Sequence, residues 1–158
     1  MKDFERHQLA TELGFQYDPE TSSIYGENSG YFFLLRETDT KNVFTISLSV
    51  SRDDAEEAAA QLHQMVKDSS VLKRISLNQY VTTFTAKAGM TKAKTIENIR
   101  QALTEILQFL QTNGFYTVCG YSGEKGLVGL YQIDDSLFLM NEECFKELST
   151  QLKIETDS

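Results

Sequence analysis

The residues with the clearest chemical potential in this chain are two cysteines near its C-terminus. Cys119 and Cys144 are each followed, three positions later, by an oxygen-bearing residue, Ser122 in the first case and Glu147 in the second. Paired knuckles of the form C-x2-C direct four thiolates at one tetrahedral zinc ion. Because half of those thiolates are absent, the spacing indicates the outline of a zinc site with an incomplete ligand set.

Several interpretations of Cys119 and Cys144 stay open on the sequence alone. Zinc binding would require Glu147 or Asp135 as oxygen ligands, because a serine hydroxyl stays protonated near neutral pH and is a poor zinc ligand. Without metal, the knuckle shape could persist empty, or both thiols could pack as small hydrophobes. A disulfide requires contact between the two segments in an oxidising compartment. We interpret the pair as vestigial and expect no cofactor, with zinc as the alternative.

Other spacings fall short of a catalytic or phosphate-binding motif. In segment 120–123 the second glycine comes one residue too early for a nucleophile elbow. Glycines recur at every third position over 123–129, but Lys125 does not directly follow the last of them, as a P-loop requires. His63 has no partner at metal-binding helical spacing, and His7 lies among charged and polar residues. We therefore expect a protein without enzymatic activity.

Aromatic side chains are concentrated in the C-terminal segment: Tyr116, Tyr121, Tyr131, Phe138 and Phe145. An exposed aromatic face is typical of a surface that binds another protein. We therefore select Tyr121, Tyr131 and Phe138 as candidate partner-binding residues. The alternative is that these side chains form the core of this small segment.

The composition is that of a folded, acidic protein. Its 158 residues fit one ordinary domain, and 41% apolar residues with ten phenylalanines can form a real core. The net charge of −8 repels phosphate backbones and anionic lipid, so we expect no nucleic-acid partner. The sequence shows no disulfide framework, no apolar signal region and no run of the roughly 18 apolar residues that a membrane span needs. We expect a cytoplasmic protein.

Charge and glycine content divide the chain into two parts. Residues 115–158 carry 3 basic and 8 acidic side chains, and five of the nine glycines fall between Gly114 and Gly129. We predict a core domain over 1–114 and a small glycine-rich hairpin-helix element over 115–158.

Three helices and five strands are predicted in the core domain. In chain order they are a helix over 3–13, strands over 23–27, 31–36 and 43–50, a helix beginning near Ser51, strands over 72–79 and 81–88, and a helix over 92–113. Strict alternation over 43–50 predicts a half-buried strand, and apolar residues at i, i+3, i+4 and i+7 over 92–113 predict a helix with one buried face. We expect Phe4, Leu9 and Leu13 to share one side of the first helix.

The element order α-β-β-β-α-β-β-α resembles the type III secretion chaperone fold. That resemblance covers about two thirds of the chain and implies a bacterial-type dimer that binds a protein segment and performs no chemistry. The remaining segment resembles a degenerate zinc ribbon or treble clef, through the spacing of Cys119, Ser122, Cys144 and Glu147.

These observations predict an α+β fold in which helices flank an antiparallel sheet of about five strands. The expected function is that of a chaperone-like, adaptor or regulatory module that binds another protein. One alternative is a small-ligand sensor with a pocket lined by Phe32, Phe44 and Phe84. A second alternative is a metal- or redox-responsive protein that uses Cys119 and Cys144.

Overall fold

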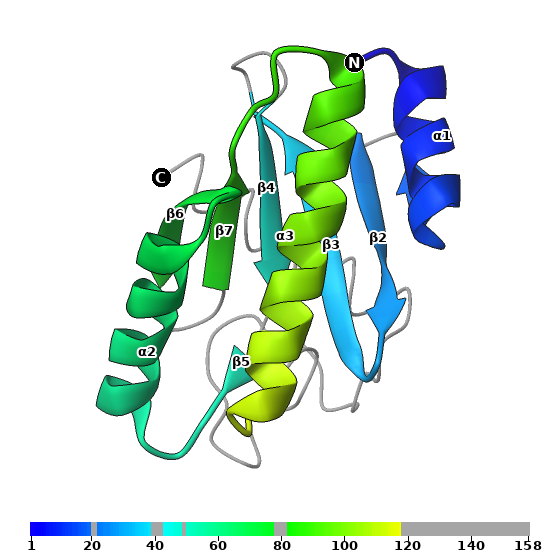
Figure 1. Ribbon diagram of the computed structural model, residues 1–158. Coiled ribbons are helices and arrows are strands. Elements are labelled where there is room, and N and C mark those ends of the chain that lie inside the picture. Colours follow the sequence, from blue (N-terminus) through cyan, green and yellow to red (C-terminus); the bar gives the residue numbers. More distant parts are fainter. Residues whose placement is uncertain (20–21, 39–42, 49, 78–81, 118–158) are drawn as a thin grey trace, which may run out of the picture.

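The computed structural model describes residues 1–19, 22–38, 43–48, 50–77 and 82–117, and these form an α+β fold (Figure 1). The elements in chain order are α1 (Asp3–Leu13), β1 (Gln16–Asp18), β2 (Ser23–Asn28), β3 (Tyr31–Glu37), β4 (Phe44–Leu48), β5 (Val50–Ser51), α2 (Ala55–Asp68), β6 (Leu72–Leu77), β7 (Thr82–Ala86), α3 (Lys92–Thr112) and β8 (Tyr116–Thr117). The predicted fold class is therefore confirmed.

The main sheet has six strands in the order β1-β2-β3-β4-β7-β6, and every neighbouring pair is antiparallel. The prediction of about five strands missed β1, which is too short at three residues to show an alternating pattern. The short strands β5 and β8 pair separately, with Val50 opposite Thr117. The predicted strand over 43–50 is thus divided between two sheets.

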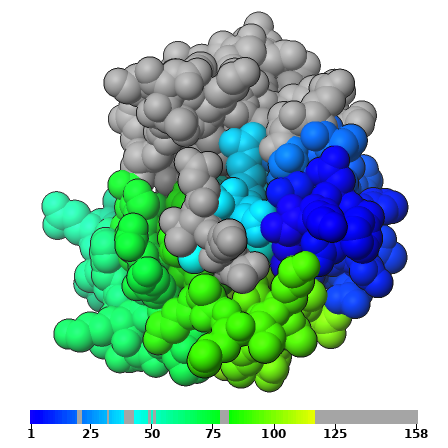
Figure 2. Space-filling model, turned by 90° about the horizontal axis from the view of Figure 1, so that it is seen from above, coloured from blue at the N-terminus to red at the C-terminus, as the bar shows by residue number. Residues whose placement is uncertain are grey.

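The three helices lie along the sheet in an order that follows its strands. Helix α3 runs across the middle strands, α2 lies at the β6 end, and α1 lies at the β1 and β2 end (Figure 1). A view from above places α1 and α2 at opposite sides of the molecule (Figure 2). Helix α1 therefore packs on the sheet of its own chain.

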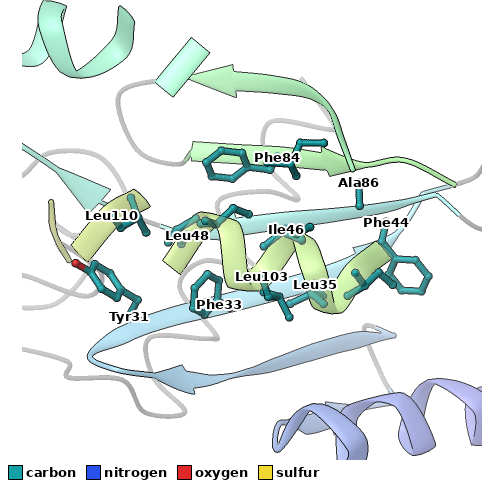
Figure 3. Close-up of a cluster of buried hydrophobic side chains, with 14 of the residues drawn as sticks. Tyr31, Phe33, Leu35, Phe44, Ile46, Leu48, Phe84, Ala86, Leu103 and Leu110 are labelled. Carbon is teal, nitrogen blue, oxygen red and sulfur yellow. The ribbon is translucent and has the colours of Figure 1, made fainter. Parts of the chain in front are cut away.

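The hydrophobic core fills the space between the sheet and α3 (Figure 3). Alternate strand residues provide one side of it, and the most deeply buried are Phe33, Leu35, Phe44, Ile46, Leu48, Phe84 and Ala86. Helix α3 contributes Ile99, Ala102, Ile106 and Leu110, whose spacing follows one helical face. Each of the large side chains stabilises the fold by about 1.5–3 kcal/mol through burial.

Two local predictions about the helices are wrong. The second helix was expected to begin near Ser51, but Ser51 lies in β5 opposite Tyr116, and the N-cap residue of α2 is Asp54. Phe4 was expected on the buried side of α1, but its exposed fraction is 67%. Leu9 comes five positions after Phe4, which is about 140° around a helix, so the two side chains do not share a face.

The first residues after α3 belong structurally to the core domain. Phe115 is buried in the core, and its carbonyl oxygen accepts a hydrogen bond of 2.8 Å from the buried hydroxyl of Tyr31. Desolvation by burial raises the pKa of the Tyr31 phenol, which keeps the hydroxyl available as a donor.

Candidate functional site

The site residues expected from the sequence lie outside the described part of the chain. This applies to the candidate metal ligands Cys119 and Cys144, and to the candidate partner-binding residues Tyr121, Tyr131 and Phe138. The side chain of Phe32 also lies outside it. These predictions therefore remain predictions.

Two of the phenylalanines expected to line a ligand pocket are core residues. Phe44 and Phe84 have exposed fractions of 1% and 0% and pack among the strand residues shown in Figure 3. Their rings stabilise the contact between the sheet and α3. His63 is exposed on α2 and His7 is exposed on α1.

The structure instead shows a surface groove between α2 and α3, which lie side by side in Figure 1. Its volume is about 680 Å³, within the range of about 300–1,000 Å³ typical of ligand sites. One wall and its end come from α2 and the turn after it: Gln61, Gln64, Met65, Asp68, Ser69 and Ser70. The other wall comes from the C-terminal half of α3: Glu105, Gln108, Phe109, Thr112 and Asn113.

The floor of the groove is apolar because two helices each turn one large side chain towards it. Met65 and Phe109 are partly buried and pack against the core beneath them. The Phe109 ring also contacts the ring of Phe115, at a centroid distance of 5.9 Å. A flexible thioether beside an aromatic ring can adapt to apolar groups of different shapes. The exposed rim above this floor carries amides from Gln64 and Gln108.

One end of the groove is acidic, and hydrogen bonds fix its geometry. The Glu105 carboxylate accepts a hydrogen bond of 2.6 Å from the Ser69 hydroxyl and one of 3.0 Å from the Gln101 side-chain amide. Asp68 is exposed on the last turn of α2 and accepts from Gln64 at 2.9 Å. Ser69 in turn accepts from the main-chain N–H of Leu72 at 3.0 Å. The same serine therefore connects α2, β6 and α3.

At the opposite end of the groove, Arg52 connects two of the lining residues, Gln61 and Asn113. Its guanidinium donates hydrogen bonds of 2.9 Å to the Gln61 side chain and of 2.9 Å to the Asn113 carbonyl. It also forms a two-point ion pair with Asp54, at 2.5 and 3.0 Å. These hydrogen bonds lower the pKa of the Asp54 carboxyl below its ordinary value. The charge of Arg52 is thus neutralised within the protein.

A second charged cluster holds α1 against the sheet. Arg6 donates a hydrogen bond of 2.9 Å to Asp3 and one of 3.2 Å to Glu37 on β3. The Tyr17 hydroxyl donates a hydrogen bond of 2.6 Å to Asp3. Burial lowers the pKa of Arg6, but its hydrogen bonds to Tyr17 and Glu37 outweigh that effect and the pKa is raised. The buried Nε of Arg6 has no hydrogen-bond partner among the described residues, but the two terminal nitrogens of the guanidinium bond Asp3 and Glu37 and join α1 to β3. The cluster therefore has a structural role.

Over the described ranges, no three His, Cys, Asp or Glu side chains come together where a metal ion could bind. None of the helices in those ranges combines the length and apolar character that crossing a membrane requires. Among known proteins, no family model, curated protein or solved structure matches this chain. Inference about function therefore rests on the groove and its side chains.

Sequence reasoning did not identify this groove, although part of its signal was present. Met65 follows Ala58 and Leu62 at the spacing of one apolar helical stripe. Phe109 directly precedes Leu110 and broadens the apolar side of α3 beyond one narrow stripe. An apolar stripe that is too wide to pack against the sheet alone indicates that α3 has a second contact surface. The spacing does not show which helix lies against that surface.

Proposed function

We propose that this protein is a non-enzymatic, cytoplasmic interaction module that binds a segment of another protein in the groove between α2 and α3. The groove itself carries the proposal: an apolar floor, an amide-rich rim and a length of about two helical turns suit a short peptide segment. The weak similarity in element order to secretion chaperones points in the same direction. A chaperone-like, adaptor or regulatory role follows from such binding.

The experiment that tests this proposal is a capture experiment with a blocked groove. Gln108→Trp places a bulky indole on the groove wall, whereas Gln111→Trp places the same group on an exposed position of α3 that does not line the groove. Tagged parent and both variants are used to capture partners from the native cytoplasm, and bound proteins are identified by mass spectrometry. We expect one partner with the parent and with Gln111→Trp, and its loss with Gln108→Trp.

Two outcomes would contradict the proposal. Capture that is unaffected by Gln108→Trp would place the partner on another surface. A partner-free parent that retains a small molecule displaced by Gln108→Trp would replace the interaction module with a ligand sensor, for which the groove volume is also adequate.

A further inference from the structure

The ionisable side chains that line the groove between α2 and α3, among the described residues, are acidic. Within the described part of the chain, Asp68 and Glu105 are the only ionisable side chains that line it, and both lie near one end. The C-terminus of α2 lies at the same end, where the last carbonyls of a helix carry partial negative charge. At the other end, Arg52 bonds the lining residues Gln61 and Asn113, and its charge is already paired with Asp54. The described side chains that line the groove therefore carry a net negative charge.

The acidic end is also held in a fixed arrangement before any partner arrives. Glu105 is only partly exposed, and both of its carboxylate oxygens accept hydrogen bonds, from Ser69 and from Gln101. A carboxylate fixed in this way loses little side-chain entropy when a cation binds. Remaining lone pairs on its oxygens can accept from an ammonium or guanidinium group.

The groove walls favour a helix over an extended strand as the occupant. Main-chain N–H and C=O groups along α2 and α3 are bonded within each helix, so they offer no ladder of partners to an extended peptide. A helical peptide satisfies its own main chain and needs only side-chain contacts. From Glu105 to Thr112 the wall rises by about 10 Å at 1.5 Å per residue, which suits apolar anchors at i, i+3 or i+4, and i+7.

From these three observations we propose that the groove binds a basic amphipathic helix of a partner protein. Apolar side chains of that helix rest on Met65 and Phe109, and a Lys or Arg at one flank meets Glu105 and Asp68. This inference rests on the proposed function and adds the chemistry of the partner to it. The partner is a helix with one apolar face and a cationic flank, complementary to a chain of net charge −8.

Designed peptides test this chemistry directly. Three 14-residue helical peptides carry the same leucine face, with Lys, Gln or Glu at the flanking positions, and their affinities are measured by isothermal titration calorimetry. Amide chemical shifts locate each peptide on the protein. We expect the Lys peptide to bind about tenfold more tightly than the Gln peptide, with shifts confined to α2 and α3 around the groove, and the Glu peptide to bind most weakly.

Charge variants of the protein complete the test. Glu105→Gln keeps the size of the side chain and an oxygen that can accept one of the two hydrogen bonds, but it removes the charge. We expect it to lower the affinity for the Lys peptide about fivefold. Glu97→Gln makes the same charge change on an exposed turn of α3 that does not line the groove, and we expect no change. The preference for Lys over Gln should also decline as salt is raised, because screening weakens partly exposed charge pairs.

The proposal would be overturned by equal binding of the Lys and Gln peptides, by tighter binding of the Glu peptide, or by shifts that map away from the groove. Absence of binding by all three peptides would overturn it as well. None of these results decides the proposed function, because that is tested separately by capture from the native cytoplasm with Gln108→Trp. If the peptides show no charge preference but capture still depends on the groove, the protein remains an interaction module. Only the class of its partner would then change.

Discussion

The guanidinium of Arg52 donates from Nη1 to the main-chain carbonyl of Asn113, 2.9 Å away and 61 residues later in the chain. Asn113 is the C-cap of α3, so a cation meets carbonyls that have no partner within the helix. The same guanidinium lies 5.0 Å from the centre of the Phe115 ring and bonds Gln61 on α2. One side chain thus fixes the spacing of the two helices that form the groove.

Replacing Arg52 by Lys should destabilise the protein although the charge is kept. An ammonium group cannot hold Asp54, Gln61 and Asn113 at once, because it lacks the planar fork of donors. We expect a loss of about 2 kcal/mol in the free energy of unfolding, measured by urea denaturation. Arg100→Lys is the matched control: its pair with Glu12 is 2.9 Å long but half exposed, so its effect should stay within about 0.5 kcal/mol. Equal stability of the Arg52→Lys variant and the parent would refute the role assigned to Arg52.

Acid should weaken the ion pair between Arg52 and Asp54. The hydrogen bonds from Arg52 lower the folded-state pKa of the Asp54 carboxyl, so this group stabilises the fold above its unfolded pKa of about 3.9. That contribution is lost as the pH falls through the lower, folded-state pKa. An NMR titration should show a depressed pKa for Asp54 in the parent and an ordinary one in Arg52→Ala. A carboxyl pKa that is the same in both proteins would contradict the assignment.

Removing the Ser69 hydroxyl should loosen the acidic end of the groove. Ser69 donates to Glu105 and accepts from the main-chain N–H groups of Val71 and Leu72. Ser69→Ala leaves these partly buried groups without that partner, and we expect a loss of about 1–2 kcal/mol in thermal unfolding measurements. Ser70→Ala, at the adjacent exposed position, should change little. If the two variants are equally stable, Ser69 does not connect α2 to α3 as described.

An alanine at Gly89 should destabilise the start of α3. A Cβ atom there would lie 2.6 Å from the main-chain nitrogen of Thr95, and a helix backbone cannot move aside at little cost. The main-chain N–H of Gly89 also donates a hydrogen bond of 3.0 Å to the Thr95 hydroxyl, and displacement of either segment would break this bond. We expect Gly89→Ala to lower the unfolding free energy by about 1–3 kcal/mol. Met90→Ala provides the control, since Met90 is 99% exposed, and a similar loss in both variants would exclude the steric explanation.

Most of the core could be predicted from local periodicity. Alternation along 43–48 and the helical spacing over 92–112 depend only on the geometry of one element, and both identify side chains that are buried in the structure. The boundary near Ser51 could not be predicted in the same way. Whether Ser51 caps a helix or extends a strand depends on Tyr116, a pairing partner 65 residues later.

The groove shows what periodicity leaves undetermined. Hydrophobic spacing predicts that Met65 and Phe109 each lie towards an apolar environment, but it does not predict that α2 and α3 lie beside each other. That arrangement follows from the strand order, in which β7 lies between β4 and β6, and from contacts such as Ser69 with Glu105.

The sequence by itself thus determined an acidic α+β protein with a core built on particular strand and helix faces. Composition sets the charge, and local geometry sets which side chains can be buried together within one element. Only the tertiary structure placed two carboxylates, Asp68 and Glu105, beside one apolar floor. Such a site requires contacts between distant segments, and these are decided by the packing of the whole domain.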